Sequence, residues 1–224
     1  MGLNGQQTKK QQISGVTEVI GVNGGTFDPI HFGHLRPALE VCEALGFSQV
    51  RFVPAYQPVH RQTPQVSAQQ RLEMTQLALA DQARFCVDAR EIDRAGPSWM
   101  VDTLASLQRE HPRAAFILIM GEDVFAHFDQ WHDWSGILRL ANIVVAQRPQ
   151  ACAAHTINQP LYQTYEVDCF TQPAGQVLRL PVTQLAISAS DIRARRAQGL
   201  SIDYLLPTGV QAYIEAHHLY ASRP

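Results

Sequence analysis

Residues 24–34, GGTFDPIHFGH, decide the fold of this chain, together with the segments on either side. Residues 18–23, EVIGVN, are predicted to form a strand, and residues 33–45 carry apolar side chains at helical spacing and end before Gly46, a helix stop. Two glycines after a strand let backbone amides approach a phosphate without a Cβ in the way, and the helix N-terminus adds its positive dipole. The stretch therefore predicts a strand, a turn and a helix that together bind an anion.

Two histidines stand at the start of that helix. His31 and His34 are three residues apart, which puts both imidazoles on the same side of a helix. We expect them to face bound phosphates and to donate hydrogen bonds to nonbridging oxygens. The alternative is a strand–helix turn with two histidines that face solvent. Because the eleven-residue string fixes many independent positions, it favours nucleotide binding.

The rest of the chain alternates strand and helix patterns. Further strands are predicted at 47–54, 85–88, 115–120, 142–146 and 177–181. Further helices are predicted at 67–81, from 97 to before 111, and at 207–218. The alternation predicts an α/β fold, a Rossmann-like doubly wound and mainly parallel sheet with helices on both faces, in which ligands bind beyond the carboxyl ends of the strands.

The domain organisation follows from what the sequence lacks. No internal repeat and no sharp shift in composition divides the chain. We therefore expect residues 1–17 to be a flexible lead-in and residues 18–224 to be a single domain. Within it, residues 147–175 are expected to form a long, weakly ordered excursion.

Composition and charge exclude several classes of protein. The chain has 224 residues and a formal net charge of −2, so nothing draws its whole surface to nucleic acid or anionic lipid. Its longest apolar run, residues 114–120, is far shorter than the ~18 residues of a membrane helix. The first 14 residues are polar and rich in glutamine, with no apolar core of a secretory signal, so the cytoplasm is the expected location.

The basic residues constrain how phosphates could be bound. Lysine occurs only at Lys9 and Lys10, and the other 16 basic residues are arginines. This excludes a Walker A loop and any Schiff-base chemistry within the folded part. Arginine, histidine and backbone amides must therefore bind any phosphate. The four cysteines form no pair at metal-ligand spacing, so we predict no metal site made by the protein.

A second polar segment, residues 187–193 with the sequence ISASDIR, directly follows the last predicted strand and opens a helix. Ser188 and Asp191 form a capping box, which on its own would only close a helix end. Ser190 and Arg193 lie on one helical face, however, so exposed amides, a hydroxyl and a guanidinium could converge on a polyphosphate. Arg193 would supply the cation that the absent lysines do not.

These two segments together resemble the nucleotidyltransferase superfamily with its H-x-G-H signature, and specifically the bacterial nicotinate-nucleotide adenylyltransferases. The resemblance runs from about residue 18 to 220. It rests on further motifs in matching order: PVHR at 58–61, PSWM at 97–100, GED at 121–123, Trp131, RP at 148–149 and LP at 206–207. The departures are Val59, Trp99, Met100 and Gln130, which cluster at the acceptor site of the family, and Ser190, which keeps the hydroxyl of a family threonine.

The resemblance implies transfer of AMP from ATP to the 5′-phosphate of a pyridine mononucleotide, with Mg²⁺ sharing the neutralisation of charge. It implies catalytic roles for His31, His34 and Arg193. It also implies ATP contacts from Gly24, Gly25, Thr26, Phe27, His34, Gly121, Asp123, Ile187, Ser188, Ser190 and Arg193. The acceptor contacts that it implies are His60, Arg61, Met100, Trp131 and Arg148.

Several alternatives stay open at this point. The acceptor could be the acid or the amide mononucleotide, or the chain could be a non-catalytic nucleotide-binding module. Other superfamily members, the pantetheine-phosphate and cytidylyl transferases, are rivals, although the first class usually has a lysine after the second strand. Trp131 could be a core residue rather than a stacking platform, and Asp123 could be a helix cap rather than a ribose ligand. The sequence does not indicate an oligomeric state.

Overall fold

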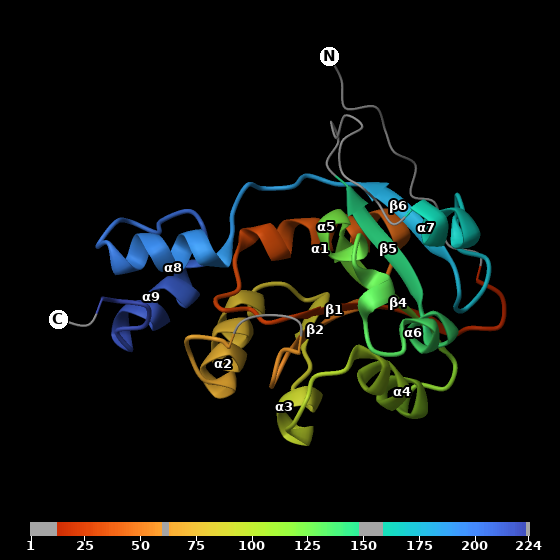
Figure 1. Cartoon of the computed structure of the whole chain (residues 1–224), viewed down its shortest axis with the longest axis horizontal. Coiled ribbons are helices and arrows are strands. Elements are labelled where there is room, and N and C mark those ends of the chain that lie inside the picture. Colours follow the sequence, from red (N-terminus) through yellow and green to blue (C-terminus); the bar gives the residue numbers. More distant parts are fainter. Residues whose placement is uncertain (1–12, 60–62, 148–158, 223–224) are drawn as a thin grey trace, which may run out of the picture. The chain divides into compact units, whose positions relative to one another are not determined.

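The computed structural model of the chain describes residues 13–59, 63–147 and 159–222. Within these ranges the strands are β1 (Glu18–Gly25), β2 (Gln49–Pro54), β3 (Phe85–Val87), β4 (Ala114–Gly121), β5 (Asn142–Gln147) and β6 (Val177–Pro181). They form one sheet in the order β3-β2-β1-β4-β5-β6, and Figure 1 labels all of these strands except β3. The pairs β1 with β4, β4 with β5 and β5 with β6 are parallel. The chain adds β2 and β3 on one side of β1 and then adds β4, β5 and β6 on the other side. This strand order confirms the predicted Rossmann-like, doubly wound α/β fold.

The helices are α1 (Phe32–Leu45), α2 (Ala68–Leu79), α3 (Arg90–Arg94), α4 (Met100–Glu110), α5 (Glu122–Phe125), the 3₁₀ turn η1 (Phe128–Gln130), α6 (Trp134–Leu140), α7 (Gln159–Tyr165), α8 (Ala189–Ala197) and α9 (Thr208–Ala216). The capping box that predicted α2 is present: Ser67 Oγ accepts from Gln70 N at 3.2 Å, and the Gln70 side chain accepts from Ser67 N at 3.1 Å. The excursion predicted over 147–175 is wrong in its described part. Residues 159–165 form α7, and Tyr162 and Leu161 are buried there.

The chain divides into two compact units, and residues 1–12, 60–62, 148–158 and 223–224 within their bounds lie outside the described part. The first consists of Met1–Asn23, Pro37–Val50 and Met100–Thr183, and the second consists of Gly24–Arg36, Arg51–Trp99 and Gln184–Pro224. The predicted boundary between a lead-in (1–17) and one domain (18–224) stays a prediction, and residues 1–12 lie outside the described part of the chain.

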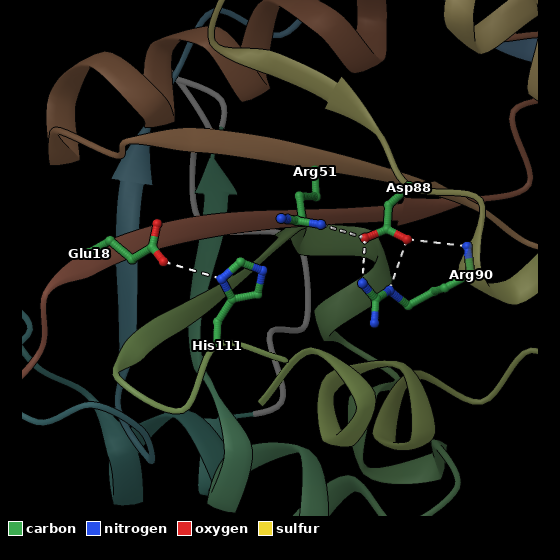
Figure 2. Close-up of polar contacts among 5 residues, drawn as sticks. All are labelled: Glu18, Arg51, Asp88, Arg90 and His111. Carbon is green, nitrogen blue, oxygen red and sulfur yellow. Dashed lines mark hydrogen bonds and ion pairs between the residues drawn. The ribbon is translucent and has the colours of Figure 1, made fainter. Parts of the chain in front are cut away.

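The first unit holds the most apolar strands. Residues 114–120 of β4 are buried without exception, as are residues 142–146 of β5, which is typical of strands covered on both faces. Helix α4 packs on β4 and α6, and α5 packs on β4 and β5. At the start of β1, His111 Nδ1 lies 3.3 Å from Glu18 Oε1 (Figure 2). These contacts fix β4, whose carboxyl end carries the predicted Gly121 segment.

The second unit is organised around α2, which packs on β3 and α9. Its buried acid Asp88 follows β3 and bonds two guanidinium groups, Arg51 Nη1 at 3.0 Å and Arg90 Nε at 2.8 Å (Figure 2). Burial by itself would raise the pKa of Asp88, but the hydrogen bonds from Arg90 and Arg51 together hold this pKa below its ordinary value. Between α2 and α9, the Tyr213 hydroxyl of α9 donates to Glu73 of α2. Ion pairs therefore join β2 to the segment that follows β3, and helix packing joins α2 to β3 and α9.

Candidate functional site

The turn after β1 is shaped by a close contact between Gly25 and Phe27. A Cβ placed on Gly25 would lie 2.6 Å from the Phe27 ring, so only glycine fits there. Phe27 is buried, with its φ at +50°, and its ring meets the His34 ring edge-on at a centroid distance of 5.1 Å. The glycine of the sequence motif therefore makes room for an aromatic ring that supports His34.

His31 and His34 lie side by side at the start of α1, as their spacing predicts. Their ring centroids are 3.8 Å apart. The His31 backbone N–H donates to His34 Nδ1 at 3.3 Å, so the proton of the neutral His34 ring lies on Nε2. His34 thus has a defined tautomer with a single ring donor.

His31 is almost completely buried, with 4% of its surface exposed. Burial lowers the pKa of His31 from 6.5 to about 4, so its imidazole is neutral at pH 7. Its Nδ1 is buried and has no hydrogen-bond partner among the described residues. An unpartnered buried polar atom costs stability and marks a position where a bound ligand can complete the hydrogen bonding.

Gly33 lies where the histidine turn, residues 24–34, contacts the second polar segment, residues 187–193. A Cβ at Gly33 would lie 2.9 Å from His31 Nδ1 and 3.0 Å from the Ile187 carbonyl oxygen. Any side chain at this position would push apart the imidazole and the 187–193 segment. The glycine of the H-x-G-H motif is therefore required by close packing of these two segments.

The 187–193 segment forms the N-terminus of α8, as predicted. Ser188 is the N-cap and its Oγ accepts from Asp191 N at 3.1 Å, while Ser190 Oγ lies 3.0 Å from Ser188 Oγ. Both serines are exposed. The structure thus confirms the cap and leaves two hydroxyls at a solvent-accessible helix N-terminus.

Arg193 extends from α8 to the histidine turn. Its Nη1 donates to the backbone carbonyl of Asp28 at 2.6 Å and lies 3.8 Å from Asp28 Oδ2. Its Nε is buried without a hydrogen-bond partner among the described residues. The second unit therefore brings His31, Ile187 and Arg193 together around one turn.

Sequence reasoning missed three residues of this arrangement: Asp28, Arg71 and Tyr220. Arg71, 1% exposed, donates from Nη1 to the Thr26 carbonyl at 2.7 Å and from Nη2 to the Tyr56 carbonyl at 3.1 Å. Asp28 Oδ1 accepts from the Tyr220 hydroxyl at 2.7 Å. Burial and the nearby Asp28 carboxylate raise the pKa of Tyr220, which keeps its hydroxyl protonated as a donor. The sequence signals for this network are Asp28, within the GGTFDPIHFGH string, and an arginine among the buried residues of α2.

In the first unit, Gly121 is the N-cap of α5, and Asp123 folds back over it. Asp123 Oδ1 lies 2.7 Å from the position of a Cβ on Gly121, and no side chain caps α5. Asp123 is exposed, whereas the adjacent Glu122 accepts from Gln147 Nε2 at 2.8 Å. The Asp123 carboxylate therefore lies at the surface. Its contact with a ribose stays a prediction.

The predicted acceptor residues are only partly described. Trp131 is half-buried, follows η1 and lies with its ring 5.7 Å from the buried Phe128, and Met100 is half-buried at the start of α4. Trp131 is therefore not a fully buried core residue. His60, Arg61 and Arg148 lie outside the described residues.

Comparison with known proteins gives consistent results at the family level. The family model "Cytidylyltransferase-like" matches residues 22–195. The chain is 52% identical over 204 residues to the protein named "Probable nicotinate-nucleotide adenylyltransferase" in Hydrogenovibrio crunogenus, a match that covers 90% of this chain and 97% of that protein. It is 44% identical over 214 residues to the protein of the same name in Dechloromonas aromatica, with 92% and 99% covered.

Solved structures agree on the fold. The Plasmodium falciparum nicotinic acid mononucleotide adenylyltransferase complexed with APC matches with a TM-score of 0.70 at 15% identity, over 91% of this chain and 97% of that one. The same enzyme complexed with NaAD matches with a TM-score of 0.68. None of the helices within the described residues is long and apolar enough to cross a membrane. From the extent of the family model and the identity to these relatives, the chain belongs to the nicotinate-nucleotide adenylyltransferase family, within the cytidylyltransferase-like nucleotidyltransferases.

Proposed function

We propose that this chain transfers AMP from ATP to the 5′-phosphate of nicotinic acid mononucleotide, which yields deamido-NAD and pyrophosphate. The names of its relatives support this reaction. The observation that carries it within the structure is the His31–His34 pair, with ring centroids 3.8 Å apart at the N-terminus of α1 and a buried, unpartnered His31 Nδ1 within the described part of the chain. Such a pair is suited to bind phosphate oxygens.

The reaction needs no covalent enzyme intermediate, because the acceptor phosphate is itself a nucleophile. Catalysis then consists of in-line placement and stabilisation of the charge that develops on the α-phosphate and on pyrophosphate. In this proposal His34 donates from Nε2 to the α-phosphate region, and the neighbouring His31 contacts the α- and β-phosphates. Arg193 and the N-terminus of α8 bind the β- and γ-phosphates. Because an anion beside an imidazole favours its protonated form, bound ATP would raise the pKa of His31 above its value in the free protein.

The remaining site residues keep the roles predicted for them. Gly24, Gly25, Thr26, Phe27, Ile187, Ser188 and Ser190 line the triphosphate, and Gly121 and Asp123 bind the adenosine portion. His60, Arg61, Met100, Trp131 and Arg148 bind the acceptor. Trp131 offers a half-buried aromatic face for a pyridine ring, a contact worth on the order of 1 kcal/mol.

Mg²⁺ enters this proposal as the counterion of ATP. Among the described residues no group of three or more His, Cys, Asp or Glu side chains could form a cage for a metal ion. Mg²⁺ is commonly bound through substrate phosphates and water with few protein ligands, so the residues present fit this mode of binding. When bound, the ion would neutralise charge on the triphosphate. Cytoplasmic location and the absence of nucleic-acid or membrane partners also stay predictions.

The test is pyrophosphate release from Mg²⁺–ATP with nicotinic acid mononucleotide and with nicotinamide mononucleotide, measured in parallel. We expect rapid release with the acid form and much slower release with the amide. Comparable rates with both would refute the acid preference and would locate the cause among Trp99, Met100 and Gln130. If the protein bound ATP but released no pyrophosphate with either acceptor, it would be a nucleotide-binding module rather than an enzyme.

A further inference from the structure

We infer that Tyr220, in the C-terminal turn, is a positioning residue for the phosphate site: its hydroxyl holds the Asp28 carboxylate and so prevents a close ion pair between Asp28 and Arg193. This inference rests on the proposed function, because it assumes that Arg193 binds the phosphates of ATP. Tyr220 acts through Asp28 and touches no substrate.

Asp28 is the point where four segments of the second unit meet. Its Oδ1 accepts from the Tyr220 hydroxyl at 2.7 Å, and its Oδ2 accepts from Gln65 N at 2.9 Å. Its backbone carbonyl accepts from Arg193 Nη1 at 2.6 Å. Asp28 is 6% exposed, so water cannot readily replace any of these donors.

The positions of the two Asp28 oxygens relative to Arg193 give the mechanism. Arg193 Nη1 lies 3.8 Å from Oδ2, which is longer than a charge-assisted hydrogen bond of 2.7–2.9 Å. The carboxylate is kept in this orientation by two donors, Tyr220 and Gln65, one on each oxygen. Without the hydroxyl, Oδ1 would be a buried anionic oxygen that has lost its donor, and the carboxylate would be free to turn towards the guanidinium of Arg193, whose Nη1 already lies 3.8 Å from Oδ2. Arg193 would then neutralise Asp28 instead of the phosphates.

The C-terminal turn is built to present this hydroxyl. Leu219 and Tyr220 are both buried, and Leu219 N donates to the Ile214 carbonyl at 2.9 Å, which closes the turn after α9. Ser222 Oγ donates to the Ala197 carbonyl at the end of α8, the helix that carries Arg193. Tyr220 also adopts a φ of +58°, a conformation that is unfavourable for a non-glycine residue. The turn therefore constrains Tyr220 at both of its flanks.

The test compares Tyr220→Phe with Tyr213→Phe, a matched control in the same unit. Both changes remove one tyrosine hydroxyl from a carboxylate, since Tyr213 donates to Glu73 between α9 and α2. For Tyr220→Phe we expect the Kd of Mg²⁺–ATP, measured by titration calorimetry, and the KM for ATP to rise about tenfold, the factor expected for loss of one hydrogen bond to a charged group. The KM for the mononucleotide should change less than twofold. Tyr213→Phe should leave all three values unchanged.

A double-mutant cycle with Asp28→Asn separates positioning from simple destabilisation. The neutral amide of Asn cannot form an ion pair with Arg193, so Tyr220→Phe should change the Kd of Mg²⁺–ATP less than twofold in the Asp28→Asn background. An equal effect in both backgrounds, or an unchanged Kd in Tyr220→Phe alone, would overturn the inference. Failure of the proposed function is distinguishable, because it would appear as wild-type protein that binds Mg²⁺–ATP but releases no pyrophosphate. The Kd comparison would decide the role of Tyr220 even then.

Discussion

The burial of His31 predicts that folding stability depends on pH in a specific window. The pKa of His31 is about 4 in the folded protein and 6.5 when exposed, so the unfolded chain binds more protons between these values. Stability is therefore fully present above pH 6.5 and is lost as the pH falls towards 4. The shift of 2.5 units corresponds to about 3 kcal/mol over the whole window, and to about 2 kcal/mol at pH 5.

Urea unfolding of wild type and His31→Gln at pH 7.5, 6 and 5 measures this contribution. Between pH 7.5 and 5 the wild type should lose about 2 kcal/mol more of its free energy of unfolding than the variant, because glutamine does not titrate. His127→Gln, which removes an exposed histidine of the first unit, controls for the loss of one imidazole. Parallel pH curves for wild type and His31→Gln would refute the argument that His31 is buried in its neutral form.

Three further predictions concern the same turn and the N-terminus of α8, which contacts it. His34→Ala should lower kcat by at least a hundredfold with an unchanged circular dichroism spectrum, because it removes the proposed donor to the reacting phosphate, and near-normal turnover would remove His34 from the mechanism. Gly33→Ala should cost about 1–3 kcal/mol of stability in urea unfolding, because its Cβ would lie 2.9 Å from His31 Nδ1; an unchanged midpoint would show that the turn relaxes freely. Ser188→Ala should lose about 1 kcal/mol as an N-cap and also raise the KM for ATP, whereas Ser67→Ala, which removes the N-cap of α2, should lose similar stability with an unchanged KM.

Much of the fold could be predicted because the signals are local. The capping box at Ser67 and Gln70 forms as its spacing predicts, and the apolar run 114–120 becomes the buried strand β4. One glycine of the histidine turn, Gly25, is explained by a contact two residues away, with the Phe27 ring, whereas Gly33 also meets the distant Ile187 carbonyl. Local periodicity and local sterics carry this information, so one sequence is sufficient to read it.

Other elements had no local signal. Helix α7 is only seven residues long, and its burial depends on neighbours distant in the sequence: Arg179 of β6 lies over the Tyr162 ring at 3.7 Å. Arg71 bonds a carbonyl 45 residues away, and Tyr220 bonds an acid 192 residues away. A hydrogen bond of this kind is determined by the tertiary fold, which no period or spacing in the sequence reports.

Arg193 shows what the structure adds to a site residue that the sequence already indicates. The sequence predicts that it is the cation that replaces an absent lysine, and the structure holds it on the Asp28 carbonyl at 2.6 Å. An arginine that is already ordered loses less side-chain entropy on meeting a phosphate, and its charge needs little reorganisation in the transition state. The carboxylate beside it would cancel this benefit if it paired fully with the guanidinium. The distance of 3.8 Å to Asp28 Oδ2, maintained by donors on both carboxylate oxygens, is therefore the feature that lets one arginine be both ordered and available.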